Sequence, residues 1–535
     1  MSGFSASQAD AVAWIEANRK RFSDFNLQIW NFAEPAWREY KSARAYVELL
    51  QGEGWQVEAG SGGMPTAFAA TWSHGKGGPV LGGFAEYDAV PGNSQAIVPY
   101  RAPREGLHPW TAGHTDPHSQ LGTTSLVGML ATRAMMQKHN LPGTLLFFGE
   151  PAEKVCGSKP VHAAKGYFDG CDAFIAYHPY ATNTVMAETQ CGAYWSAVIT
   201  FETLAPESWI DKTLLPIRTS AHATARCPGA IDALCLMYTM TKYTKEAMYP
   251  HAGAWTLNEF IMVGGDATSD NLPPRLSQIQ YSWRSPSLAV QEQIARVLAN
   301  NARQAAATTA CQASLRWVTK TRVGLSNSKM IELTWRNLER VGAPAYGDEA
   351  RQFAREIQKN LGLAPMENPF ADDNERLVPP ADYEASQRRA LPPGQLHIGA
   401  DDYVEYSWHA PTVRLFTMRP ALRVPDDAYE YPAWARNALG GLPAAIDPGL
   451  FVGAKTIATT FLDLIERPAE LAAARAEFRD RTGGGVGGGK WVAPLLPRDF
   501  TPPVDLRWPE YVTTARGEEW WIPTPNPQAG FGERL

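Results

Sequence analysis

An aspartate and a histidine two residues apart, Asp116 and His118, form the pattern in this chain best suited to chemistry. They stand in Gly113-His114-Thr115-Asp116-Pro117-His118, just before an apolar helical pattern that begins near Leu121. A loop at a helix start can turn both side chains inward, and a carboxylate with an imidazole suits zinc or manganese. Alone, the pair is also compatible with a solvated loop or an N-capping aspartate.

Further acids and imidazoles follow predicted strands, at the strand end or in the loop that comes next. They are Asp88, Asp116 with His118, Glu150 with Glu153, and His178. In open α/β sheets, the carboxyl edge of the strands is where ligands bind. Because four separate apolar runs deliver such groups to one edge, the sequence predicts a metal or acid–base site there.

The elements that must position these residues alternate between two periodicities. Apolar residues with helical spacing predict helices over 7–34, 42–51, 122–138 and 159–165, and short apolar runs predict strands over 66–72, 79–86, 144–148 and 173–177. Strands alternating with helices at this spacing predict βαβ units. The expected fold class is therefore α/β with a mainly parallel sheet.

From about Glu188 the pattern changes to a compact α+β block of about 120 residues. Its expected strands are 194–201, 260–263 and 278–283, and its expected helices are 229–246 and 287–307. The α/β pattern then resumes through strand 412–417 and helix 448–464. We therefore expect an α/β domain formed by 1–187 and 311–466, an inserted domain over 188–310, and a helix, glycine-rich linker and Pro/Trp-rich tail over 467–535.

Composition limits the classes of function. The net charge is −6, so no basic excess favours a nucleic-acid backbone. The chain contains no run of about 18 apolar residues, so no membrane span is predicted, and the first residues lack a signal-peptide pattern. The six cysteines form no C-x-x-C pair, which favours a reducing, cytoplasmic compartment.

The stretch Gly483–Lys490 nearly spells a phosphate-binding loop. However, Trp491 stands where a magnesium-binding serine or threonine is required, and no predicted strand precedes the stretch. A flexible linker is the preferred interpretation.

Taken in order, the motifs resemble the metallo-amidohydrolase and carboxypeptidase family with a co-catalytic metal site, most of all its p-aminobenzoyl-glutamate and auxin-conjugate hydrolases. They are Ala85-Glu-Tyr-Asp-Ala-Val-Pro91, Gly113-His114…His118…Leu121-Gly122-Thr123, Pro151-Ala-Glu153, Lys165-Gly-Tyr-Phe-Asp-Gly170 with His178-Pro179, Ser220-Ala-His-Ala223, Arg284-Ser-Pro286, and Asp402 with Ser407-Trp408…Pro411-Thr412-Val413. The resemblance implies a parallel-sheet catalytic domain, an inserted lid and dimerisation domain, and amide hydrolysis by metal-activated water.

The resemblance also implies a metal site that is incomplete in this chain. Asp116 matches the residue that bridges two metals, and His118 and His178 match the other ligands of the first metal. Both remaining ligands of the second metal are lost, to Lys154 and Pro432. We therefore expect one divalent ion, zinc or manganese, on Asp116, His118 and His178, with the Lys154 ammonium roughly in the vacated cation position. A decayed, inactive site is the alternative.

Further roles follow from the resemblance alone. They are Glu153 as general base, Lys154 as a second group acting in catalysis, His222 as a residue of the partner subunit that steadies the oxyanion, Arg284 and Asn271 as ligands of a substrate carboxylate, and Asp88 and His114 as residues supporting the metal ligands. For Arg284 a structural salt bridge, and for His114 a turn, are the alternatives.

The function expected from these residues is metal-dependent hydrolysis of an amide in an N-acyl or N-aroyl amino acid. A hydrolytic deaminase of an aromatic amine and a non-catalytic small-molecule binder remain alternatives on the same scaffold. The expected partners are a small-molecule substrate and a second copy of the chain, joined through the inserted domain; neither nucleic acid nor membrane is expected.

Overall fold

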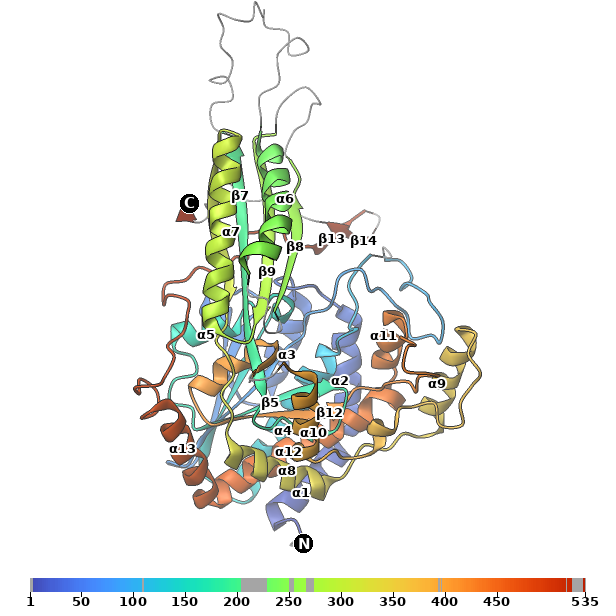
Figure 1. Ribbon diagram of the computed structural model, residues 1–535. Coiled ribbons are helices and arrows are strands. Elements are labelled where there is room, and N and C mark those ends of the chain that lie inside the picture. Colours follow the sequence, from blue (N-terminus) through green and yellow to red (C-terminus); the bar gives the residue numbers. More distant parts are fainter. Residues whose placement is uncertain are drawn as a thin grey trace, which may run out of the picture.

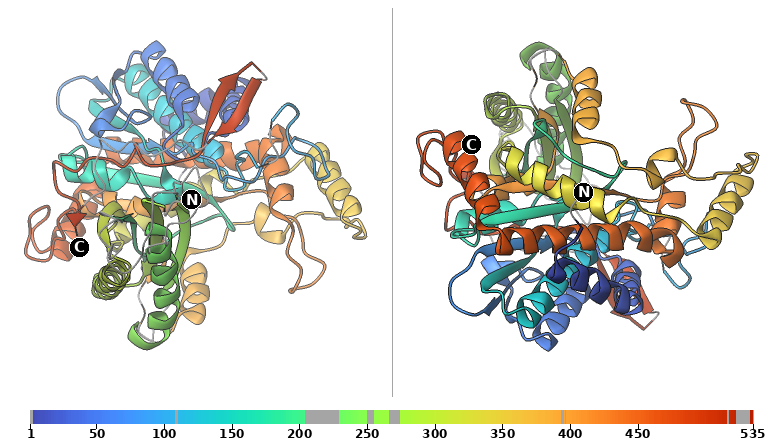
Figure 2. Two further views of the ribbon diagram at one scale, coloured as in Figure 1. Left: turned by 90° about the horizontal axis from the view of Figure 1, so that it is seen from above. Right: turned by 90° about the horizontal axis from the view of Figure 1, so that it is seen from below.

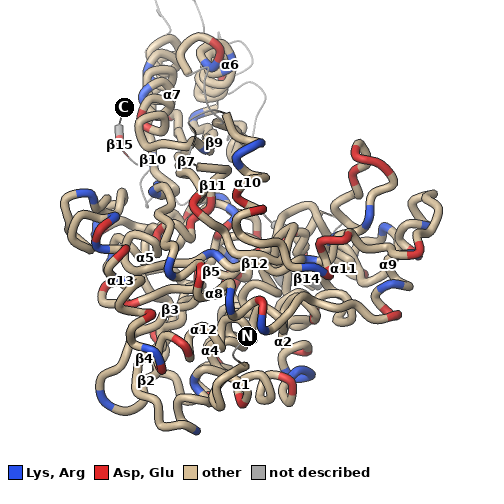
Figure 3. The backbone as a smooth tube through the Cα atoms, turned by 60° about the horizontal axis from the view of Figure 1, so that its bottom comes forward, with Lys and Arg blue, Asp and Glu red and all other residues tan. Residues whose placement is uncertain are grey.

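Two sheets organise the chain, a broad one in an α/β body and a second one in a block that projects from it (Figure 1). The computed structural model describes residues 3–107, 110–203, 229–249, 255–265, 274–392, 395, 397–515, 517–521 and 533–534. Basic and acidic residues are interspersed over this part of the chain (Figure 3).

The sheet of the body has seven strands in the order β1-β2-β4-β3-β5-β12-β6. They are β1 (Gln56–Ala59), β2 (Phe68–His74), β3 (Val80–Ala85), β4 (Gly143–Gly149), β5 (Ala173–Tyr180), β6 (Thr184–Val185) and β12 (Thr412–Met418). The central strands β4, β3, β5 and β12 are parallel, whereas the pairs β1–β2, β2–β4 and β12–β6 are antiparallel. The sheet is therefore mixed, and the expectation of a mainly parallel sheet holds only for its centre. The link between β5 and β6 is too short for the crossover that a parallel neighbour needs.

Helices cover this sheet and bury its core. They are α1 (Ala6–Ala17), α2 (Arg19–Phe32), α3 (Tyr40–Gly52), α4 (His118–Lys138), α5 (Lys159–Lys165), α8 (Ser328–Val341) and α12 (Pro443–Glu466). The helix expected over 7–34 is divided at Asn18, which serves as C-cap of α1 and N-cap of α2. Helix α12 is long and apolar enough to cross a membrane, yet 83% of its most apolar window is buried inside the fold. It packs against α4, α8 and α1, as a core helix does.

Three further helices lie between α8 and α12 in the chain: α9 (Asp348–Asn360), α10 (Pro380–Ala390) and α11 (Ala433–Gly441). A 3-10 helix, η6 (Asp402–Trp408), follows the short strand β11 (His397–Ala400) and contacts α5. Helix α11 begins directly after Pro432, which is its N-cap.

The projecting block lies in the part of the chain where the sequence analysis expected an inserted domain. Its sheet has the order β15-β10-β7-β9-β8, formed by β7 (Gln190–Thr203), β8 (Thr256–Val263), β9 (Leu276–Ser285), β10 (Cys311–Lys320) and β15 (Glu533–Arg534), and β11 pairs with β7 as its sixth strand. Helices α6 (Ala230–Met248) and α7 (Leu288–Thr308) pack on it. Because β10 pairs with β7 along its length, this sheet continues to Lys320, ten residues beyond 310.

The C-terminal segment runs back across both units. After α13 (Pro468–Thr482), the glycine-rich stretch closes on the helix end, where the Lys490 N–H donates to the Thr482 carbonyl at 2.9 Å. Downstream, Asp505 pairs with Arg316 of β10 through two hydrogen bonds of 2.6 and 2.7 Å, and Glu510 pairs with Arg38. The hairpin β13 (Glu510–Thr514) and β14 (Gly517–Trp521) lies beside the N-terminal helices (Figure 2).

Candidate active site

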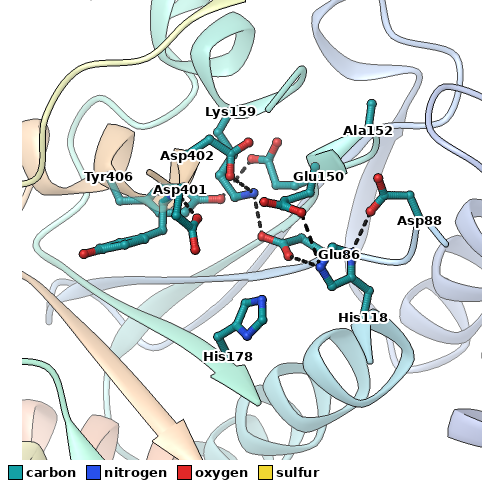
Figure 4. A network of polar contacts seen from close by, with 12 residues as sticks. Glu86, Asp88, His118, Glu150, Ala152, Lys159, His178, Asp401, Asp402 and Tyr406 are labelled. Carbon is teal, nitrogen blue, oxygen red and sulfur yellow. Dashed lines mark hydrogen bonds and ion pairs between the residues drawn. The ribbon is translucent and has the colours of Figure 1, made fainter. Parts of the chain in front are cut away.

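His118 is the first residue of α4 and is fully buried at the carboxyl edge of the central strands. Its Nδ1 lies 2.7 Å from the Oδ1 of Asp88, a residue of the loop that follows β3 (Figure 4). A carboxylate on Nδ1 fixes that nitrogen as the donor and leaves the Nε2 lone pair free to bind. Nε2 faces Asp116, 3.6 Å from its Oδ2. The predicted supporting role of Asp88 therefore has the expected geometry.

His178 lies within β5 and approaches Asp116 from the opposite direction. Its Nδ1 donates to the Pro179 carbonyl at 2.6 Å, which again leaves Nε2 free. That Nε2 is 4.0 Å from Asp116 Oδ1, and the two imidazole rings are edge-to-face at 5.8 Å. Burial lowers the pKa of His178 to about 4, against the opposing charge of Asp116, so the ring is neutral at neutral pH.

Lys154 follows β4 in a tight turn and reaches into the same cluster. Its Nζ lies 2.8 Å from Asp116 Oδ2, 3.0 Å from Glu153 Oε2 and 2.9 Å from His118 Nε2. Burial disfavours the ammonium, but the Asp116 and Glu153 carboxylates outweigh it and raise the pKa of Lys154 well above its ordinary value. Lys154 is therefore an ammonium at neutral pH.

The short contact between Lys154 and His118 has room for only one proton. Burial and Lys154 act to lower the pKa of His118, whereas Glu86 and Asp88 outweigh them and raise it to about 9. The pKa of Lys154 is higher still, and an N–H on Nε2 would point at the ammonium 2.9 Å away. At this distance only one of the two nitrogens can carry a proton toward the other, so the ammonium donates and His118 Nε2 accepts. The contact thereby opposes the protonation of His118 that Glu86 and Asp88 favour.

This placement sharpens the expectation for Lys154. The sequence predicted an ammonium in the position vacated by the second metal. The ammonium instead contacts Asp116 and His118, two of the three residues expected to hold the retained metal. On the other side of Asp116, Arg419 Nη1 is 3.7 Å from Oδ1. The carboxylate expected to bridge two metals is thus flanked by two cations of the protein itself.

The chemistry of the donor set nevertheless suits a divalent ion. His118 and His178 are both oriented through Nδ1, and the one buried oxygen of Asp116 that lacks a hydrogen-bond partner in the described structure, Oδ1, faces His178. Such an arrangement is typical of imidazole ligands with fixed tautomers. An ion and the Lys154 ammonium cannot share the same lone pairs, so binding requires the lysine to withdraw toward Glu153.

Glu153, the predicted base, lies beside the same imidazole. Its Oε2 is 3.4 Å from His118 Nε2 and faces the cavity described below. Burial acts to raise its pKa, but Lys154 and His118 outweigh it and hold the pKa well below the usual range. The carboxylate is therefore ionised and able to accept a proton.

Behind the cluster lies a buried charge network that the sequence analysis did not single out. Lys159 Nζ, at the start of α5, contacts Glu86 Oε1 at 2.7 Å and Asp402 Oδ1 at 2.6 Å (Figure 4). Glu86 Oε2 in turn is 3.2 Å from His118 Nε2. Burial raises the pKa of Glu86 to about 7 in spite of Lys159. A lysine inside a short, otherwise buried helix was the available signal, because such a charge requires a buried partner.

A cavity of about 490 Å³ opens onto these groups. Asp116, Glu153, Lys154 and His178 line one part of it, and Arg284 of β9 reaches it from the inserted unit. The guanidinium of Arg284 lies over the Tyr194 ring at 4.8 Å, and no ion pair to a carboxylate is found for it among the described residues. The alternative of a structural salt bridge thus has no partner among the described residues, and the substrate-binding role of Arg284 stays a prediction.

Other predicted site residues lie apart from the cluster. His114 is buried, and its Nε2 faces the Ile29 carbonyl of α2 at 3.3 Å, so its contact is with a helix rather than with an expected ligand. His222 and Asn271 lie outside the described residues. Pro432 offers no ligand atom at the position where the resemblance implies a histidine.

Comparisons with known proteins agree with the motifs. The chain is 26% identical over 466 residues to a subunit of the p-aminobenzoyl-glutamate hydrolase of Escherichia coli (strain K12), covering 84% of this chain and 90% of the relative. It is 22% identical over 483 residues to Xaa-Arg dipeptidase of Mus musculus, covering 88% and 91%. No protein-family model matches.

Among solved structures, the aminobenzoyl-glutamate utilization protein from Klebsiella pneumoniae superposes with a TM-score of 0.53 at 14% identity, covering 85% of this chain and 98% of that structure. This similarity supports a shared fold. Together, these findings confirm the resemblance to metal-dependent amidohydrolases and peptidases, and the predicted class of enzyme, a hydrolase.

Proposed function

We propose that this protein hydrolyses an amide bond in a small N-acyl or N-aroyl amino acid. The observation that carries the proposal is the cluster of Asp116, His118, His178 and Glu153 beside a cavity that Arg284 also lines. The relatives named for aminobenzoyl-glutamate hydrolysis support the same substrate class. A carboxylate of the substrate bound by Arg284 would hold the amide against Glu153.

In this proposal, Asp116, His118 and His178 hold one divalent ion, zinc or manganese, when it is bound. Such an ion would supply polarisation of a water molecule or of the amide carbonyl. Glu153 accepts a proton from water and returns it to the leaving nitrogen, since its carboxylate is ionised and faces the cavity. Lys154, displaced from His118, keeps its contact with Glu153 and orients that carboxylate.

The inserted unit is proposed to join two copies of the chain. Large apolar side chains are exposed on β8 and α6, namely Phe260, Ile261, Tyr238, Tyr243 and Met248. Strand β8 is at the edge of its sheet and has unpaired backbone groups. Exposed apolar groups beside a free strand edge are typical of a protein interface.

Product analysis tests the reaction. The full chain loaded with manganese or zinc is expected to release free amino acid from N-benzoyl amino acids, and Glu153→Gln is expected to lower kcat by about 100-fold to 10,000-fold. Ammonia released from an aromatic amine, without amide cleavage, would identify the deaminase instead. Binding of the same compounds without turnover by either protein would identify a non-catalytic binder.

Metal analysis tests the ion count. We expect about one zinc or manganese per chain after equilibration and removal of loosely bound ions. Two tightly bound ions, or none, would overturn the single-ion site. Sedimentation at micromolar concentration tests the dimer, and Phe260→Glu is expected to shift it to the monomer.

A further inference from the structure

Arg414 is a buried cation in the wall of the cavity. It lies in β12, all seven residues of which are buried, and only 3% of its surface is exposed. Its Nη2 pairs with Asp401, and its guanidinium lies over the Tyr403 ring at 4.2 Å. Its Nη1 is buried and has no hydrogen-bond partner in the described part of the chain. A buried charged donor without a partner is unfavourable, so it is expected to serve a ligand.

The orientation of this guanidinium is determined by its neighbours. Asp401 contributes one oxygen to Arg414, while its other oxygen accepts the Tyr403 N–H at 3.1 Å. The Tyr403 hydroxyl in turn donates to Gln190 at 2.8 Å. Asp401 and Tyr403 therefore hold the plane of the Arg414 guanidinium in place, and its Nη1 is left without a partner.

A flat apolar wall adjoins Arg414. Residues two apart on a strand share a face, so Phe416 projects on the same side, and it is the register partner of His178 on β5. Phe416 stacks on Tyr180 with ring centroids 4.7 Å apart and an angle of 28°. Met186 and Ile398 line the same cavity. A planar ring resting on this wall would thus have a cationic donor beside it and the catalytic cluster within the same cavity.

The positive groups of the cavity differ in how far they are neutralised. Lys154 is paired with both Asp116 and Glu153, and Arg414 is paired through one edge only. Arg284 has no ion pair to a carboxylate among the described residues. The two arginines come from different units, β9 of the inserted block and β12 of the body. Two arginines from separate units therefore line one cavity.

We propose that Arg414 binds a carboxylate carried on the aromatic part of the substrate, in addition to the carboxylate bound by Arg284. The inference rests on the proposed function for the bond that is cleaved. It narrows the substrate class to an aroyl amino acid whose ring bears an acidic group. The planar guanidinium suits a carboxylate, because its nitrogens match the two oxygens in one plane.

Binding measurements on the full-length Glu153→Gln protein test this subsite without turnover. The probes are N-benzoylglycine and its 3-carboxy and 4-carboxy ring derivatives, titrated by calorimetry at neutral pH. We expect at least one ring carboxylate to tighten binding about tenfold. Adding Arg414→Gln should abolish this gain and change the affinity for N-benzoylglycine less than threefold. Adding Arg284→Gln, the matched control, should weaken binding of all the probes.

Two results would overturn the subsite: no gain from a ring carboxylate at either position, or an equal loss for all probes in Arg414→Gln. If that variant does not fold, Arg414→Lys keeps the charge without the planar fork. It is expected to retain only part of the gain, and an equal weakening of all probes would again overturn the subsite. Wild-type protein that binds the probes in this pattern but cleaves no amide would contradict the proposed reaction and leave the subsite standing.

Discussion

Two pairs of neighbours around Asp116 contrast sharply, and each carboxylate oxygen faces one member of each pair. The imidazole side is His118 and His178, each held through Nδ1 with Nε2 directed toward the carboxylate. The other side is Lys154 and Arg419, which place fixed positive charges against the same group. The imidazoles are suited to receive a cation, whereas the second pair already supplies cations of the protein. If one ion binds as proposed, side-chain charge takes the place of a second ion.

Removing a ligand from the imidazole side should have the largest effect. His118→Asn deletes the Nε2 lone pair that Asp88 orients, so bound metal should fall from about one ion per chain to below about a tenth. The affinity loss should exceed the 10-fold to 100-fold that is typical of supporting residues. Atomic emission after dialysis measures it. Retained stoichiometric metal would show that the imidazole side is not the ion site.

Removing charge from the other side should have the opposite sign. Lys154→Met keeps the length of the side chain but deletes the ammonium that occupies two ligand atoms, so metal affinity should rise about tenfold. Competition with a coloured chelator gives the change. Weaker binding in this variant would mean that the lysine helps to hold the ion, which reverses the comparison.

Acid should weaken the imidazole side through His178. The pKa of this residue is about 4 in the folded chain and about 6.5 when unfolded, so its contribution to stability is complete above pH 6.5 and is lost as the pH falls toward 4. For the metal-free protein, about 3 kcal/mol should be lost over this range. His178→Asn lacks this contribution. The stability difference between the two proteins in urea should therefore shrink as the pH is lowered from 7 to 4, and a constant difference would contradict the assignment.

The smallest effect is expected at Arg419. Its guanidinium is 3.7 Å from Asp116 and partly exposed, so water screens it more than Lys154. Arg419→Gln should tighten metal binding only about twofold to threefold in the same chelator assay. An effect as large as that of Lys154→Met would show that both cations oppose the ion equally.

Sequence alone supported part of this site for a physical reason. Strand ends are visible as the limits of apolar runs, and parallel strands bring those ends to one edge, so Asp88, His118, Glu153 and His178 could be grouped. The same periodicity carries no information on strand direction, which is why the antiparallel pairing of β2 with β4 was not foreseen. The short strands β11 and β15 pair over two to three residues, too few for a periodic signal.

The sequence pattern does not show which groups the long cationic side chains contact. Lys154 bends back onto His118 because several rotatable bonds allow it, and Arg419 finds Asp116 across 303 positions of sequence. Arg414 was recognisable in the sequence, since a charged residue inside an otherwise uncharged, buried strand needs a partner. This signal identifies Arg414 but not its partner Asp401, because that pairing depends on how β11 and η6 fold over the strand end.

The C-terminal segment adds a mechanical property to the chain. Asp505 is tied to the inserted unit through Arg316, and five residues later Glu510 is tied to the body through Arg38. Five residues span at most about 18 Å when fully extended. A swing of the inserted unit that carried these anchor points farther apart would have to break one ion pair or peel the segment away. The segment thus acts as a tether of fixed length, which limits how far Arg284 can move from Asp116 and Glu153.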